Sequence, residues 1–162
     1  MVRIRPLVTF KSTAFNITEP RPYFINECCF GDDTAKYLLS ELQRSGLRVG
    51  DKPGQEDFGW YLNFEVADVS HCLVLLYRSD DVREGATWIG VLERNRGFFG
   101  SIFGRRAHGI QASAAKAIHR VLATSTLIRD VRWHFQEDFD KGHEEKGAST
   151  PQESNESTDG DE

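Results

Sequence analysis

The sequence predicts an α+β fold, in which a mainly antiparallel sheet carries two helices packed on one of its faces. Three observations support this prediction. Residues 57–66 alternate between apolar and polar side chains, as in a strand with one buried and one wet face. A short hairpin connection at 67–70 leads into an apolar run at 71–77, which predicts a central strand. Apolar residues at helical spacing, after residues 32 and 110, predict the two helices.

The predicted elements follow one another in the order β-β-α-β-β-β-α-β. The first strand, at 3–10, is expected at an edge of the sheet, because Pro6 has no N–H to donate to a neighbouring strand. A short strand is expected at 23–25. The remaining strands are predicted at 57–66, 71–77, 87–93 and 128–135. Hairpin connections dominate this order, which favours an antiparallel sheet.

The first helix is predicted to begin at Gly31-Asp32-Asp33, because aspartate accepts hydrogen bonds from the free amides of a first turn and suits the helix dipole. It ends at Gly46, a residue type common just beyond a last turn. The buried stripes are Ala35, Leu38, Leu39 and Leu42 in the first helix, and Ile110, Ala114, Ile118 and Val121 in the second. We expect Trp60, Leu62 and Phe64 to be buried against them.

Charge divides the chain into a body and a tail. Residues 137–162 carry ten acidic and two basic side chains, a net charge of −8, which leaves +3 for residues 1–136 given −5 for the whole chain. The tail has few large apolar residues to offset the entropy of ordering it. The sequence therefore predicts a single α+β domain at 1–136 and a disordered acidic tail at 137–162, whose simplest role is to keep the protein in solution.

The composition favours a cytoplasmic protein. No window approaches the roughly 18 consecutive apolar residues of a membrane span, and no apolar segment of a signal peptide follows the charged N-terminus. The three cysteines do not form an even disulfide framework, which favours free thiols in a reducing compartment.

Two adjacent carboxylates, Glu56 and Asp57, stand at the entrance of the alternating strand. Together with a nearby histidine such as His71, they could form the acid–base pair of an enzyme. Neighbouring strand residues point to opposite faces, however, so the same carboxylates could simply solvate a turn. The enzyme is the alternative hypothesis for function.

The sequence predicts no metal site and no cofactor. The candidate ligands Cys28, Cys29, His71 and Cys72 lack the spacing of a zinc site. Signatures of a serine nucleophile or of a phosphate-binding glycine loop are also absent from the sequence.

The loop at 94–109 is the main candidate binding element, because arginine and aromatic side chains dominate interface energetics. The predicted binding residues are Arg94, Arg96, Phe98, Phe99, Phe103, Arg105 and Arg106. A protein partner is favoured, since a nucleic-acid-binding body would carry more charge than +3. The phenylalanines could instead pack on the core. We also expect the acidic tail to compete with any anionic partner for this loop.

Three short motifs resemble a family of small bacterial proteins without an established activity. They are Phe30-Gly31-Asp32-Asp33, Glu56-Asp57-Phe58-Gly59-Trp60 and Arg94-Asn95-Arg96-Gly97. The resemblance covers about residues 23–135 and implies a bacterial, cytoplasmic, stand-alone domain, with no catalytic residue to transfer. The sequence thus favours non-enzymatic binding of a macromolecular partner by a regulatory or immunity-type protein.

Overall fold

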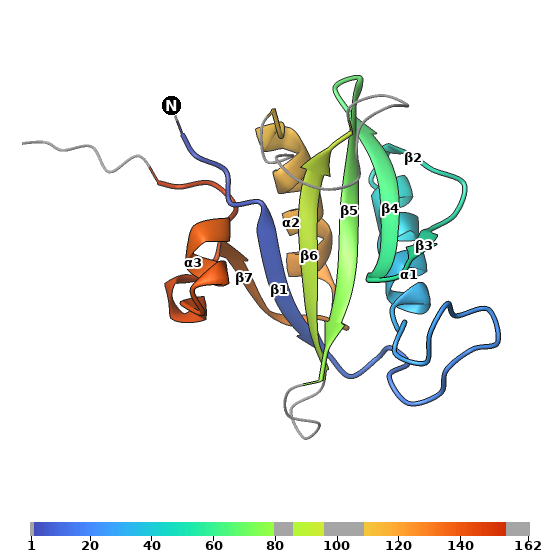
Figure 1. Ribbon diagram of the computed structural model, residues 1–162. Helices are drawn as coiled ribbons and strands as arrows, with labels where there is room; N and C mark the ends of the chain where they lie inside the picture. The colour runs from blue at the N-terminus through green and yellow to red at the C-terminus, as the bar shows by residue number, and fades with distance from the viewer. Residues whose placement is uncertain (1, 80–85, 96–108, 155–162) are drawn as a thin grey trace, which may run out of the picture.

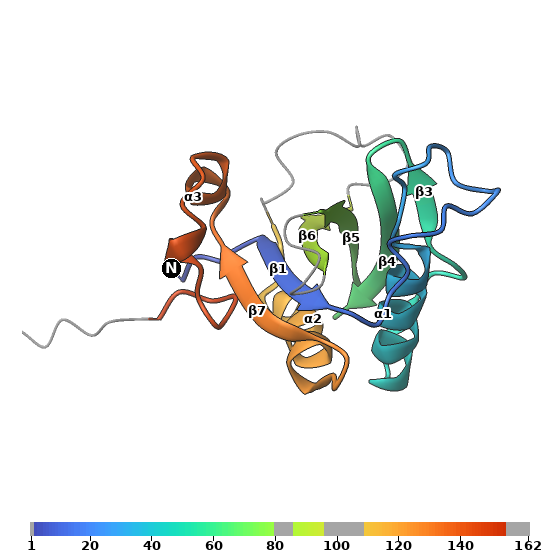
Figure 2. The same ribbon diagram turned by 90° about the horizontal axis from the view of Figure 1, so that it is seen from below.

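A computed structural model describes residues 2–79, 86–95 and 109–154 of the chain. It confirms the α+β class: a seven-stranded sheet, antiparallel at every pairing, carries α1 and α2 on one face, while α3 lies beyond β7 (Figures 1 and 2). The strands run in the order β2-β4-β5-β6-β1-β7, with β3 also paired to β4. Their bounds are β1 Leu7–Ser12, β2 Arg48–Val49, β3 Gly54–Glu56, β4 Gly59–Val66, β5 Val69–Arg78, β6 Ala86–Arg94 and β7 Arg129–His134. The helices are α1 Asp32–Arg44, α2 Ala112–Thr124, α3 Gln136–Asp140 and the 3₁₀ turn η1 Glu144–Lys146.

The hairpin of β4 and β5 forms the centre of the fold. Ala67 and Asp68 both have positive φ, 51° and 62°, the conformation of a two-residue turn whose twist matches that of its strands. The turn places Val66 opposite Val69, and this pairing fixes the register of every later residue pair in the hairpin. The predicted hairpin connection is therefore confirmed, but its turn is only residues 67–68, because Val69 and Ser70 already belong to β5.

The core lies between this sheet and the two helices. Trp60, Leu62 and Phe64 of β4 are buried on one face, as the alternation predicts. Leu38 and Leu42 of α1 and Ile118 of α2 belong to the same buried apolar core as these strand residues. The predicted contact between strand and helices is confirmed.

Gly59 explains why a glycine precedes the buried tryptophan in the alternating strand. Its φ is 155°, and a Cβ built on it would lie 2.2 Å from the carbonyl oxygen of Leu75 on β5. A side chain at this position would push the two strands apart.

Two strand predictions are wrong. The first strand is not at an edge, since β1 lies between β6 and β7. Pro6 stands just before it and contributes only its carbonyl, which accepts a hydrogen bond from the N–H of Leu92 at 2.8 Å. The segment at 23–25 is a loop rather than a strand. The side-chain amide of Gln55 holds this loop. Its oxygen accepts a hydrogen bond from the N–H of Ile25, and its nitrogen donates one to the carbonyl oxygen of Tyr23.

The predicted disorder from residue 137 is also wrong for residues 137–154. We call residues 136–154 the C-terminal segment. Ala148 exchanges two backbone hydrogen bonds with Trp133 of β7, at 2.7 and 2.8 Å. The backbone N–H of Arg5 donates to the carbonyl oxygen of Pro151, and the backbone N–H of Glu153 donates to the carbonyl oxygen of Arg3. These bonds tie the segment to the N-terminus. Backbone pairing needs no apolar side chain, so composition could not reveal it; residues 155–162 lie outside the described part of the chain.

The C-terminal segment should therefore stabilise the fold. Deleting residues 141–162 removes its four backbone hydrogen bonds to Arg3, Arg5 and Trp133. At roughly 0.5–1.5 kcal/mol each, the free energy of unfolding should fall by about 2–6 kcal/mol, measured by chemical denaturation. Deleting only residues 155–162 keeps these bonds and is the matched control. Equal free energies of unfolding for the two truncated proteins would show that the segment docks without stabilising the fold.

Candidate functional site

The structure does not bring the predicted acid–base residues together. Glu56 is the last residue of β3 and pairs with Gly59, whereas His71 pairs with Phe64. These two partners lie five positions apart in β4, roughly 17 Å along the strand. Asp57 is exposed in the turn that follows Glu56. The geometry therefore does not support an acid–base pair of these carboxylates with His71.

His71 instead anchors the start of α2. It is fully buried and stacks on Phe64, with ring centroids 5.7 Å apart. Its Nε2 accepts a hydrogen bond from the N–H of Gln111 at 3.1 Å, and its Nδ1 lies 3.1 Å from the carbonyl of Val69. The neutral ring with a proton on Nδ1 satisfies both contacts. Burial lowers the pKa of His71, which favours this neutral form.

The predicted binding loop is only partly described. Arg94 is the last residue of β6 and lies opposite His71. The other predicted binding residues, Arg96, Phe98, Phe99, Phe103, Arg105 and Arg106, lie outside the described residues. Their part in binding stays a prediction.

Metal-binding groups do not cluster in the described residues. Within 2–79, 86–95 and 109–154, no group of three or more His, Cys, Asp or Glu side chains could hold an ion. Cys28 is exposed and Cys29 and Cys72 are buried, all as free thiols. No helix in the same part of the chain is long and apolar enough to cross a membrane.

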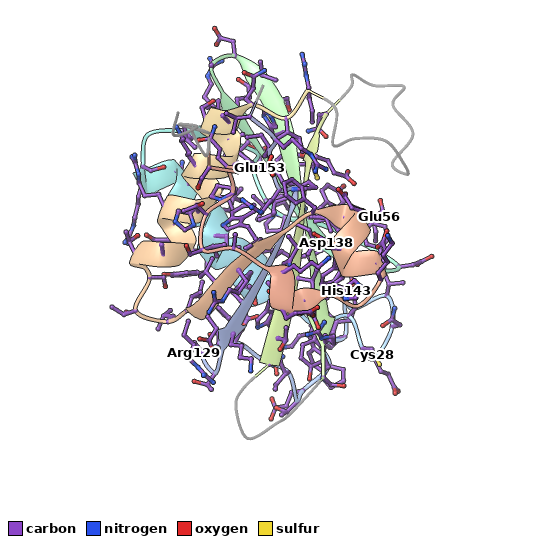
Figure 3. All side chains as sticks on the ribbon, turned by 90° about the vertical axis from the view of Figure 1, so that its left-hand side faces the viewer. Cys28, Glu56, Arg129, Asp138, His143 and Glu153 are labelled. Carbon is purple, nitrogen blue, oxygen red and sulfur yellow. The ribbon has the colours of Figure 1, made fainter. Side chains whose placement is uncertain are left out.

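A pocket of about 230 Å³ opens on the sheet face opposite α1 and α2. Strand pleating explains its lining. Val8 and Phe10 of β1 point into the helix-covered core, so Thr9 and Lys11 point to the other face. The lining residues come from β1, β5, β6, β7 and η1: Thr9, Phe10, Lys11, Arg78, Thr87, Asp130, Arg132, His134 and Glu144. Figure 3 views this region from the side of β7, with α3 and the turn at His143 in front of the strands.

Basic side chains from three strands converge on the pocket. Arg78 of β5 lies opposite Thr87 of β6, which lies opposite Lys11 of β1. Arg132 of β7 lies opposite Thr9, two residues along β1. Adjacent strands are about 4.8 Å apart, so these side chains share one small area.

Both carboxylates of the lining are paired with arginines. Glu144 Oε1 accepts a hydrogen bond from Arg78 Nη1 at 2.8 Å, and Asp130 Oδ2 lies 3.5 Å from Arg129 Nη1. The lining thus holds three cationic side chains against two anionic ones. Guanidinium groups match the geometry of carboxylate or phosphate oxygens, and threonine hydroxyls can donate to the same oxygens. The arrangement suits an anionic group.

His134 supplies shape rather than charge to the pocket. Its side chain is 2% exposed, with Nε2 2.8 Å from Thr9 Oγ1 and its ring against Phe139. Burial lowers the pKa of His134, so the ring is neutral near pH 7. Its Nδ1 is buried and has no hydrogen-bond partner within the described residues.

Sequence reasoning missed this pocket. Lys11, Arg78 and Arg132 lie far apart in the sequence, and each is an ordinary polar residue on the wet face of a strand. The available signal was the recurrence of polar residues at every second position, Thr9 and Lys11 in one strand and Arg132 and His134 in another. That signal gains meaning only once β1 is placed between β6 and β7.

Comparison with protein-family models, curated proteins and solved structures gives no match for the chain. The sequence resemblance to a bacterial family therefore stays a prediction.

Two buried histidines, His71 and His134, and the half-buried His119 make stability depend on pH. Burial lowers the pKa values of His71, His119 and His134 below the value of about 6.5 that each has in the unfolded chain. The unfolded state then binds more protons, so the free energy of unfolding should be maximal above about pH 6.5 and fall as pH drops below it. Each histidine contributes a slope of up to about 1.4 kcal/mol per pH unit.

Denaturant titrations between about pH 8 and pH 5 measure this slope. His71→Gln should reduce it, because the change removes one of the two buried rings. A stability that is flat across this range would contradict the assignment of neutral buried rings.

Proposed function

We propose that the protein binds an acidic macromolecular partner, without catalysing a reaction, through the pocket lined by Lys11, Arg78 and Arg132. The observation that carries the proposal is the convergence of these three cations from β1, β5 and β7 on one concave site. Charge-assisted hydrogen bonds from arginine to carboxylate are stronger and more directional than neutral ones. A partner carboxylate is therefore the guest that this lining suits best.

Size and charge favour a carboxylate of a protein over a nucleic acid. The pocket, at about 230 Å³, is smaller than the roughly 300–1,000 Å³ of typical small-molecule sites. A phosphate backbone would also meet Glu144, Asp130 and a chain of net charge −5. Affinity for nucleic acid depends on neutralising many phosphates, which this balance opposes.

The loop at 94–109 stays a second candidate binding element, on the evidence of its composition. Together with free thiols and the family resemblance, this favours a regulatory or immunity-type protein of a bacterial cytoplasm.

Binding of a short fluorescent peptide of glutamate and serine, measured by anisotropy at low salt, tests this proposal. Arg132 is exposed, so Arg132→Gln should fold normally and weaken binding about fivefold, the equivalent of roughly 1 kcal/mol for an exposed charge pair. Arg120→Gln makes the same charge change on α2, on the opposite side of the sheet, and should leave affinity unchanged.

Two results would count against the proposed function. One is equal affinity for the Arg132→Gln and Arg120→Gln proteins. The other is tighter binding of a single-stranded DNA oligonucleotide of matched charge, which would indicate phosphate recognition instead. Added salt should weaken peptide binding, because exposed charges are screened beyond about 8 Å at physiological ionic strength.

A further inference from the structure

The C-terminal segment places one of its own carboxylates in the proposed binding pocket. Glu144, in η1, lines the pocket and pairs with Arg78, 66 residues earlier in the chain. The 2.8 Å separation is that of a charge-assisted hydrogen bond. Glu144 is therefore bound as the carboxylate of a partner would be.

The segment is anchored on both sides of this contact. Upstream, the guanidinium groups of Arg3 and Arg5 lie over the ring of Phe135, at 4.0 and 4.8 Å from its centroid. Phe139 packs against His134 in the pocket wall. Downstream, backbone hydrogen bonds hold Ala148 on β7. Residues 141–147 thus form a turn held at both ends, which we call the bridging turn.

The bridging turn itself is held weakly. Residues 141–146 are all exposed, and the hydrogen bonds of their backbone are local, such as those from Lys146 to His143 and from Gly147 to Glu144. The side chains of Arg78 and Glu144 are 33% and 43% exposed. Exposed ion pairs contribute about 0.2–1 kcal/mol, and segments with little buried surface open at low free energy.

We propose that the bridging turn is an intramolecular competitor for the pocket, and that an acidic partner binds by displacing Glu144 from Arg78. This inference rests on the proposed function. The anchors keep Glu144 near the pocket at an effective concentration on the order of millimolar. Because its ion pair with Arg78 is weak, Glu144 lowers the affinity of the pocket for a partner but does not prevent binding. The partner that fits the pocket is a protein with a carboxylate at the tip of a surface loop or at a chain end, because the bridging turn presents the same group.

The test compares two neighbouring acids of the same turn. Glu144→Gln removes the charge that pairs with Arg78, whereas Glu145→Gln removes one that pairs with His143, away from the sheet. Both residues are exposed, so both variants should fold. With the glutamate–serine peptide at low salt, Glu144→Gln should bind about two- to fivefold more tightly than the unaltered protein, and Glu145→Gln should bind equally.

The outcomes separate the two proposals. Tighter peptide binding by both Glu144→Gln and Glu145→Gln would contradict the proposal that the bridging turn competes for the pocket, because the gain would come from net charge alone. Unchanged affinity for Glu144→Gln, together with weaker binding by Arg132→Gln, would also overturn it but leave the proposed function standing. Peptide that binds neither the unaltered protein nor Glu144→Gln would overturn both.

Amide hydrogen exchange gives a second measure that needs no variant. Saturating peptide should speed exchange at Lys146 and Gly147 while leaving Ala148 and Trp133 protected. Peptide that binds without changing exchange in the bridging turn would contradict displacement.

Discussion

The pairing of β1 with both β6 and β7 is the contact on which the rest of the structure depends. It joins residues more than 120 positions apart, such as Leu7 and His134, and connects the hairpin half of the sheet to its last strand. The same pairing sets Thr9 and Lys11 between Arg78 on one side and Arg132 on the other. It also gives the C-terminal segment the edge of β7 on which to dock.

The parts of the fold that the sequence predicts well are those coded locally. The alternation around Trp60, the turn at Ala67 and Asp68, and the stripes of α1 and α2 each depend on residues close in the chain. The position of β1 depends on distant pairing, which a single sequence does not show. The two-residue β2 and the three-residue β3 are too short for a periodic pattern, and docking of the C-terminal segment uses backbone groups that every residue has.

The site was harder to predict than the fold, for a related reason. Glu56, Asp57 and His71 have suitable chemistry, but the register of β4 with its neighbours holds them at opposite ends of the strand. Lys11, Arg78 and Arg132 carry no motif, since an isolated basic residue on the wet face of a strand is common. Their convergence follows from topology, and the ion pair of Glu144 with Arg78 identifies the kind of group they attract.

The most direct test of the pocket is a map of backbone amide chemical shifts by NMR as the glutamate–serine peptide is added. If the pocket binds acidic partners, the largest changes should occur at Thr9, Lys11, Arg78, Thr87 and Arg132, which line it together. Changes concentrated instead around the exposed side chains of Tyr23 and Ile25, or spread evenly over the surface, would contradict the assignment of this pocket as the binding site.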